Sequence, residues 1–461
     1  MPEPHSPAGT GAGSHTGTRI SARAALEAVT DPGTFAEVPV SEGEFKPDGP
    51  LDWDGYGASR ARAEERTGER ESVVCGTAEV DGTRTVLMSF EFGYLGGSLG
   101  QRTGDRIEAA HTHARTHGLP VVSLIATGGS RMQEGMRALG QLQRVARQSA
   151  LTGAAGLPQI AVLRDPTTGG GWATLGAGAD MTVALAGSQV GFAGSRVRPA
   201  DADPAAYTAE AQLAAGAVDA VVRPDELRRD LALRLKALTS PAAGPAAPPA
   251  ALGRTDPPDT GWDAVLRARA PERPRAQAYL DAYFTDRAVL RGDRCGGVDD
   301  GMLCGFGLRD GRAIGYAAQC GTATTPAGYR TAARLVRLAG RLGIPVLTLV
   351  DTPGAANGAA AERAGAGAAI ADLFAAVASS PVPVTTLVIG EGGSGGALAL
   401  AAPDNTWATP DGYFSVIAPE LAAAILKRPP SAVHATADQL RIRPQDLLEL
   451  GVIQGIVTRS Q

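Results

Sequence analysis

Four glycine-rich loops hold the residues of this sequence that are best placed to do chemistry. Each loop follows a short apolar run typical of a buried strand and precedes a stretch typical of a helix. Glycine lets a ligand approach the main chain closely, and the first N–H groups of a helix have no partner within it. Such groups can stabilise negative charge developing on a carbonyl oxygen, so the pattern predicts oxyanion sites. The loops are TGGSR (127–131), PTTGGGW (166–172), DTPGAANG (351–358) and GEGGSGGAL (390–398).

These loops are a poor match to the sequence motifs that bind nucleotide phosphates. Lys occurs only three times in the chain, at Lys46, Lys236 and Lys427, so none of the loops contains the Lys of a P-loop. The letters of 390–395 fit G-x-G-x-x-G, but this loop does not stand in a clear nucleotide-binding unit. The structural alternative is that the glycines only permit close packing of helix on sheet. Four loops in matching positions make that alternative the weaker one.

No side-chain nucleophile accompanies the loops. The six His all lie outside the four loops, so no His stands near Ser394 in the sequence to activate it. We expect His111 and His113 to be solvated surface residues, and Ser394 to be a spacer within its loop. The chemistry would therefore rest on backbone donors and on a substrate or cofactor that brings its own base.

The elements that must position the loops alternate between strand and helix. Near-continuous apolar runs at 121–126, 159–163, 346–350 and 384–389 predict strands buried on both faces. Apolar residues at helical spacing predict helices over 132–151 and 329–342. This alternation predicts an α/β fold with right-handed crossovers.

The two halves of the chain resemble each other, which indicates a duplicated domain. Pro120 and Pro345 are separated along the chain by the same interval as Pro158 and Pro383. With a slip of one residue, the pair 169–170 maps onto 395–396. The sequence predicts a disordered tail (1–20), an N-terminal domain (21–237), a linker rich in Pro and Ala (238–260) and a C-terminal domain (261–461).

Composition narrows the class of protein further. The net charge of −5, without a basic stripe, argues against a nucleic-acid partner. The N-terminus lacks the apolar core of a signal peptide and no run of 18 apolar residues occurs, so we expect a cytoplasmic protein without a membrane partner. The four Cys form no C-x-x-C pair, so neither zinc nor another metal site is expected.

With these motifs in place, the sequence resembles the carboxyltransferase component of acyl-CoA (acetyl-CoA) carboxylases, with the β part fused ahead of the α part. That family belongs to the crotonase superfamily. The resemblance implies two homologous crotonase-like (ClpP/crotonase) β-β-α spiral domains in tandem. The β-like motifs are YLGGSLG (94–100), ATGGSRMQEG (126–135), LRDPTTGGGWAT (163–174) and VGFAGSRV (190–197). Those typical of the α part include PAGYRTAARL (326–335), DTPGA (351–355), VIGEGGSGGALAL (388–400) and YFSVIAPE (413–420).

The resemblance also implies roles for the loops. Acyl-CoA would bind mainly to the N-terminal domain, whose backbone amides would hold a thioester enolate at Gly128, Gly129, Ser130, Gly169, Gly170 and Gly171. Carboxybiotin would bind to the C-terminal domain, where the amides at Gly354, Ala355, Gly395, Gly396 and Ala397 would hold the ureido oxygen. Carboxybiotin would supply both the carboxyl group and the base for the α-proton.

Further contacts follow from the same comparison. Arginines suit the phosphates of CoA, and the candidates around the first motif are Arg102, Arg106 and Arg131, together with Gly97. The acyl pocket is expected near Leu398 and Ala399, just past the last glycine pair.

The resemblance implies several partners. The chain contains no A-M-K-M biotinylation motif and no ATP-binding domain, so we expect biotin on a separate biotin carboxyl carrier protein, and a separate biotin carboxylase. A homo-oligomer with its active site across a dimer interface is expected. Two other functions stay open at this point: decarboxylation of a malonyl thioester in the same oxyanion sites, and a non-catalytic scaffold for a related subunit.

Overall fold

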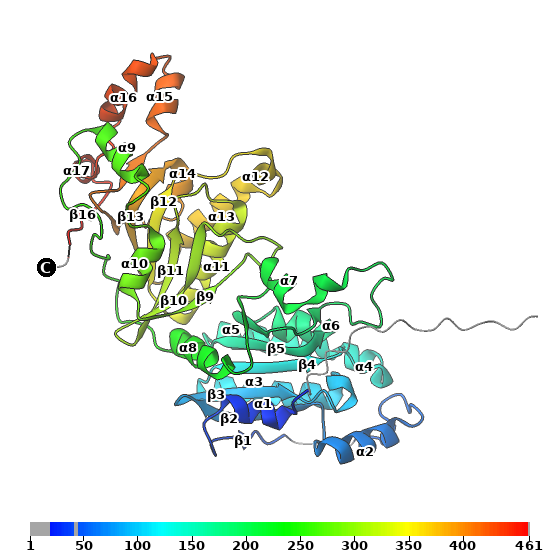
Figure 1. The fold of residues 1–461 in the computed structure, drawn as a ribbon. Helices are drawn as coiled ribbons and strands as arrows, with labels where there is room; N and C mark the ends of the chain where they lie inside the picture. Colours follow the sequence, from blue (N-terminus) through cyan, green and yellow to red (C-terminus); the bar gives the residue numbers. More distant parts are fainter. Residues whose placement is uncertain (1–18, 41–44, 460–461) are drawn as a thin grey trace, which may run out of the picture.

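The computed structural model describes residues 19–40 and 45–459. Within them the chain forms two eight-stranded mixed sheets, one after the other along the sequence (Figure 1). The first has the order β1-β2-β3-β4-β5-β6-β8, with β7 paired to β5. The second has the order β16-β14-β13-β12-β11-β10-β9, with β15 paired to β13. The predicted α/β fold with two similar halves is confirmed.

The strands of the first sheet are β1 (Ala36–Glu37), β2 (Val73–Val80), β3 (Thr83–Phe90), β4 (Val121–Thr127), β5 (Gln159–Thr168), β6 (Met181–Leu185), β7 (Val190–Gly191) and β8 (Ala220–Val222). Those of the second are β9 (Asp286–Leu290), β10 (Met302–Arg309), β11 (Arg312–Gln319), β12 (Val346–Thr352), β13 (Val384–Gly393), β14 (Thr406–Ala408), β15 (Tyr413–Ser415) and β16 (Gly455–Ile456). All four predicted buried strands are present, as β4, β5, β12 and β13.

The helices and short turns of helix lie between the strands and over the faces of the sheets. In the first half they are α1 (Ala22–Val29), α2 (Tyr56–Thr67), η1 (Leu95–Gly97), α3 (Gln101–His117), η2 (Met132–Glu134), α4 (Met136–Leu139), α5 (Gln141–Ala154), α6 (Gly169–Gly171), η3 (Trp172–Gly176), η4 (Pro204–Tyr207), α7 (Ala209–Ala214) and α8 (Leu227–Thr239). In the second they are α9 (Gly261–Arg269), α10 (Ala276–Tyr283), α11 (Pro326–Leu342), α12 (Ala359–Arg363), α13 (Ala366–Ala378), α14 (Ser394–Leu398), α15 (Pro419–Ile425), η5 (Pro430–Ala432), α16 (Val433–Gln439) and α17 (Pro444–Glu449).

The internal repeat has the same offset along the chain at the strands and helices that border the glycine loops. The first residues of α3 and α11, of β4 and β12, and of β5 and β13 are all separated by the same interval as the two proline pairs. Gly169 and Ser394 both follow the long strand and both have positive φ, 65° and 57°. The expected slip of one residue is therefore wrong: Gly170 and Gly171 correspond to Gly395 and Gly396. The connection from β3 to α3 differs, being four residues longer than that from β11 to α11.

The predicted helix over 132–151 is broken into η2, α4 and α5. Gly135 lies between η2 and α4 with φ 53°, outside helical geometry, and Gly140 lies between α4 and α5. Periodicity alone missed these breaks because the apolar spacing continues across them. The predicted helix over 329–342 forms the greater part of α11.

The segments at the two ends of the predicted N-terminal domain are described in part by the structure. Residues 1–18 of the expected disordered tail lie outside the described residues, whereas Ile20 is ordered and its carbonyl accepts a hydrogen bond from Arg164 Nη2 at 2.5 Å. The expected linker over 238–260 begins inside α8 and then packs on the second half. Pro241 bridges to Ala313, and Thr385 Oγ1 donates to the Ala246 carbonyl at 2.7 Å.

One continuous apolar core joins the two halves. Helix α8 contacts β2 and β3 of the first sheet and β9, β10 and β11 of the second. Asp219 is buried at this junction, where its carboxylate pairs with Arg294 at 2.7 Å and Arg334 at 3.2 Å. Burial disfavours the charged carboxylate, but these two guanidinium groups outweigh it and lower the pKa of Asp219 to about 2. The halves are therefore held in a defined relation.

Across the described ranges, no helix combines the length and the apolar character needed to cross a bilayer.

Candidate active site

In the first half, the glycine loops at 127–131 and 166–172 meet at one edge of the sheet. They do so because β4 and β5 are parallel neighbours, paired at Thr127 and Thr167 beside a β-bulge. A Cβ added to Gly169 would lie 3.0 Å from Gly129 Cα, so the two backbones touch. A side chain at Gly169 would press the two loops apart.

Hydrogen bonds within the first half decide which N–H groups are available. The N–H of Gly128 donates to Gly96 O at 2.9 Å, that of Gly129 to Thr127 Oγ1 at 3.1 Å, and that of Gly169 to Phe192 O at 3.0 Å. Among the described residues, the Ser130 N–H has no partner. The Gly170 and Gly171 N–H groups begin a helix, where no acceptor exists within the helix. Of the six predicted backbone donors, these three remain free for a ligand.

The second half repeats this arrangement at the constant offset. The Gly354 N–H donates to Thr352 Oγ1 at 3.1 Å, just as Gly129 donates to Thr127. The Ala355 N–H, like that of Ser130, has no partner among the described residues, and Gly395 and Gly396 lie in the first turn of α14. Ala397 lies one residue further into α14 and is fully buried.

Sequence reasoning missed the two threonines that fix these loops. Thr127 and Thr352 each end a buried strand and each orient the loop glycine two residues later. The signal was present, since both occupy the same place in the internal repeat. Threonine is common in strands, so its residue type alone did not mark these two positions.

The floor of the second site carries two buried polar side chains. Tyr329 Oη donates to Gly396 O at 3.1 Å, and Gln319 Nε2 lies 3.5 Å from the same oxygen. Burial raises the pKa of Tyr329 to about 12, so its hydroxyl stays a donor at neutral pH. A Cβ added to Gly396 would lie 2.4 Å from the Ala355 nitrogen, which shows how closely the two loops converge.

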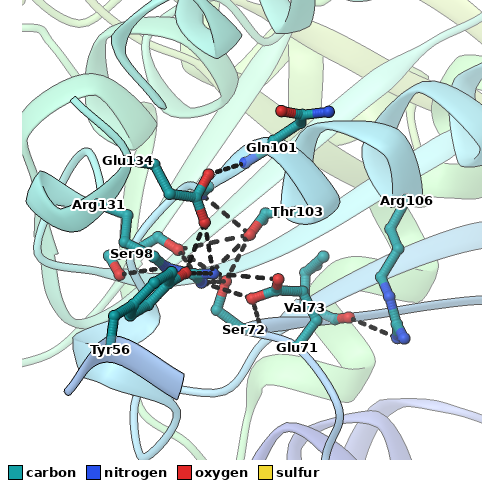
Figure 2. Close-up of polar contacts among 11 residues, drawn as sticks. Tyr56, Glu71, Ser72, Val73, Ser98, Gln101, Thr103, Arg106, Arg131 and Glu134 are labelled. Atoms are coloured by element: carbon teal, nitrogen blue, oxygen red, sulfur yellow. Dashed lines mark hydrogen bonds and ion pairs between the residues drawn. The ribbon is translucent and has the colours of Figure 1, made fainter. Parts of the chain in front are cut away.

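Arg131 does not fit its predicted role as a CoA phosphate ligand. Its side chain is 1% exposed, and Figure 2 shows it enclosed by polar groups of the same half. Its guanidinium bonds both carboxylate oxygens of Glu71, at 2.5 and 3.0 Å, and the Ser98 carbonyl at 2.8 Å. A phosphate in solvent has no access to it, so we leave Arg131 out of the CoA site.

Of the other CoA candidates, the two arginines lie where a ligand could reach them, whereas Gly97 is buried. Arg102 and Arg106 are one turn apart on α3 and both are partly exposed. Arg106 lines a hollow of about 660 Å³ together with Arg23 and Arg70. Gly97, at φ 63°, lies against β4, and a Cβ there would be 2.1 Å from Ala126 O. The two arginines remain predictions, and Gly97 has a packing role as well.

The residues expected to line an acyl pocket differ in exposure. Leu398 is 49% exposed, while Ala399 is fully buried. Phe192 follows β7 beside the first site and is 73% exposed, and Val416 follows β15 beside the second and is 74% exposed. Each site is therefore flanked by an exposed apolar side chain at an equivalent position.

The histidines lie elsewhere, but not all as expected. His111 is fully buried, with Nδ1 2.9 Å from Thr152 Oγ1, and His113 is partly buried. The expectation of solvated surface residues is thus wrong for His111. Burial, with a smaller effect of the Arg115 charge, lowers the pKa of His111 to about 4, so it is neutral at pH 7. It lies on α3 and packs against α5, and takes no part in either site.

Taken together, the fold and the two sites define a tandem α/β protein. Each half gathers backbone N–H donors at the carboxyl ends of neighbouring parallel strands. Sites of this kind stabilise an oxyanion in acyl chemistry without a protein nucleophile.

Comparisons with known proteins agree with this description. A family model described as acetyl co-enzyme A carboxylase carboxyltransferase-like matches residues 259–461. The chain is 39% identical over 471 residues to the acetyl-coenzyme A carboxylase carboxyl transferase subunits beta/alpha of Salinispora arenicola, covering 96% of this chain and 83% of that protein. It is 35% identical over 417 residues to a probable biotin-dependent acyl-coenzyme A carboxylase beta3 subunit of Mycobacterium bovis, covering 88% of this chain and 83% of that protein.

A solved structure of transcarboxylase 12S, with methylmalonyl-coenzyme A and methylmalonic acid bound, superposes with a TM-score of 0.79 at 20% identity. The match covers 96% of this chain and 87% of that chain, and confirms the fold of two similar α/β domains in tandem. Because the sequence similarity to these relatives extends over nearly the whole chain, the chain belongs to the family of acetyl-CoA carboxylase carboxyltransferases with fused β and α parts. It is a carboxyltransferase subunit of a biotin-dependent acyl-CoA carboxylase.

Proposed function

We propose that this subunit carboxylates a short acyl-CoA, acetyl-CoA foremost, to give malonyl-CoA. The carboxyl group comes from carboxybiotin on a separate carrier protein. The observation that carries the proposal is the repeated set of three backbone donors: Ser130, Gly170 and Gly171 in one half, and Ala355, Gly395 and Gly396 in the other.

On the acyl side, the first set of donors holds the thioester oxygen. When the α-proton leaves, charge builds on that oxygen, and N–H groups already oriented by Thr127 and by the start of α6 stabilise it. The donors are fixed in advance, so little reorganisation is needed as the enolate forms. No protein base is required for this step, which is consistent with His111 lying outside the site.

On the other side, the residues fit the ureido group of biotin. That group presents one carbonyl oxygen, which matches the converging N–H groups of Ala355 and Gly396. The space beside Gly395 is open, with no heavy atom within 4 Å of an added Cβ. When bound, carboxybiotin supplies the carboxyl group and a nitrogen base for the α-proton. The chain itself binds the ureido oxygen and, through Tyr329, keeps Gly396 in place.

A second copy of the chain completes the site in this proposal. Figure 1 shows α6 and α14, which begin at the two sets of donors, well apart in one chain. Exposed apolar side chains lie beside both sets: Met132 and Phe192 beside the first, and Val416 beside the second. Pairing the first half of one chain with the second half of another would bury them. The carrier protein, a biotin carboxylase and the cytoplasmic location remain predictions.

One assay separates the possible functions. Purified protein is mixed with malonyl-CoA, with and without biotin, while CO₂ and acetyl-CoA are followed; a carboxylated carrier with acetyl-CoA tests the forward reaction. We expect turnover only with biotin or the carrier. Turnover without either would identify a malonyl-thioester decarboxylase. Inactivity in both, with tight binding to another carboxylase subunit, would identify a scaffold.

A further inference from the structure

We propose that Arg131 is a positioning residue for the acyl-side donors: it ties the loop before α3 to the loop that carries the Ser130 N–H. This inference rests on the proposed function of that site. It replaces the interpretation of Arg131 as a direct ligand of CoA.

The side chain of Arg131 joins three segments of the first half (Figure 2). It donates to Glu71 before β2, as described above. Toward the loop before α3 it donates to the Ser98 carbonyl at 2.8 Å and to Ser98 Oγ at 3.2 Å. Toward α2 it donates to Tyr56 Oη at 3.2 Å. A guanidinium suits this position because its donors lie in one rigid plane.

The backbone of Arg131 reaches the same loop. Its N–H donates to Leu99 O at 2.9 Å, and the Leu99 N–H donates to Gly129 O at 2.9 Å. Ser130 lies between these two bonds, and among the described residues its own N–H has no partner. The direction of the Ser130 N–H therefore depends on where Ser98 and Leu99 are held, and the Arg131 side chain holds Ser98.

The buried polar residues around Arg131 form a cluster, which Glu134 extends to the start of α3. One carboxylate oxygen accepts from the Gln101 N–H and the other from Tyr56 Oη, both at 2.6 Å. Glu134 is fully buried, and Arg131 and Glu71 are each 1% exposed. Burial tends to raise the pKa of Glu71, but the charge and hydrogen bonds of Arg131 outweigh it and lower that pKa. The pair is thus an ion pair within the protein.

The second half shows that the loop geometry itself does not require such a cluster. Thr324 and Ala355 form the bridge equivalent to that of Leu99 and Ser130, yet the residue equivalent to Arg131 is Ala356. The first half, which contains Arg131, also has the longer connection: the segment between β3 and α3 is four residues longer than that between β11 and α11. A longer loop has more conformations to lose, and the buried guanidinium restricts them.

The test compares Arg131→Lys with Arg234→Lys, a change at an equally buried arginine that binds Asp230 and the Val289 carbonyl far from either site. Four quantities are measured on folded protein: kcat and KM for biotin-dependent acetyl-CoA formation from malonyl-CoA, the Kd for coenzyme A, and the rates of amide hydrogen exchange. For Arg131→Lys we expect kcat to fall about 100-fold, as for loss of one oxyanion donor, with the Kd for coenzyme A within about twofold. Exchange should accelerate in 95–101 and 128–131 but not in 353–358. Arg234→Lys should leave kcat and these exchange rates unchanged.

Folded Arg131→Lys with an unchanged kcat would overturn the proposal. If its affinity for coenzyme A were also tenfold weaker, Arg131 would instead be a direct ligand of CoA. Should Arg131→Lys not fold, Tyr56→Phe removes a single hydroxyl from the cluster, and we expect it to lower kcat about fivefold. Should wild-type protein show no turnover of malonyl-CoA, the proposed function fails, while the exchange rates of the two loops still decide the role of Arg131.

Discussion

Replacing Gly396 with Ala is the most direct perturbation of the second site. The added Cβ would lie 2.4 Å from the Ala355 nitrogen and 2.6 Å from Tyr329 Oη. Real Cβ atoms do not approach heavy atoms closer than 3.0 Å, so the Ala355 loop must move by more than half an ångström. Both contacts are with groups that cannot swing away freely: one is backbone, and the other is a buried ring.

The expected cost follows from the geometry of the donors. A displaced Ala355 N–H no longer points at the oxygen where charge develops, and loss of one such donor lowers kcat about 10²–10³-fold, or about 3–4 kcal/mol in the barrier. The assay is biotin-dependent formation of acetyl-CoA from malonyl-CoA, with kcat and the KM for biotin measured separately. The main effect should be on kcat, because the charge on the ureido oxygen is largest in the transition state.

The matched control is Gly367→Ala in α13 of the same half. An added Cβ at Gly367 meets no heavy atom within 4 Å, and Ala favours a helix over Gly by about 1 kcal/mol. This variant should keep full activity with equal or greater stability. Folded Gly396→Ala with a kcat within threefold of wild type would refute the assignment of Ala355 and Gly396 as an oxyanion site.

Three further predictions concern the acyl side and the stability of the fold. Gly171→Ala places a Cβ 2.4 Å from Thr127 Cγ2, so the threonine must release the Gly129 N–H, and malonyl-CoA turnover should fall about 100-fold; wild-type turnover would contradict this. Asp219→Asn leaves Arg294 and Arg334 without their buried counter-charge and should lower the free energy of unfolding by about 3–5 kcal/mol in urea titrations. His111, with its pKa near 4 when folded and 6.5 when unfolded, takes up its proton more readily in the unfolded chain. Stability should therefore be full above pH 6.5 and fall by about 3 kcal/mol as the pH drops to 4. His111→Gln should flatten that pH dependence, and an unchanged slope would show that another group causes it.

The sequence by itself determined the local and repetitive features of this protein. Near-continuous apolar runs predicted β4, β5, β12 and β13, because a strand covered on both faces must be apolar throughout. The constant offset between the halves and the glycines after those strands predicted two equivalent oxyanion sites. Both inferences depend on patterns along the chain, which can be read without knowing which residues meet in space.

Tertiary structure decided which groups are free to act. Six backbone donors were predicted in the first half, but Gly128, Gly129 and Gly169 use their N–H groups on partners that the folded chain brings near. In the same way, Arg131 is a typical phosphate ligand by residue type, yet burial against Glu71 turns it inward. Availability of a donor or a charge depends on its neighbours in space, and residue types and spacing do not specify those neighbours.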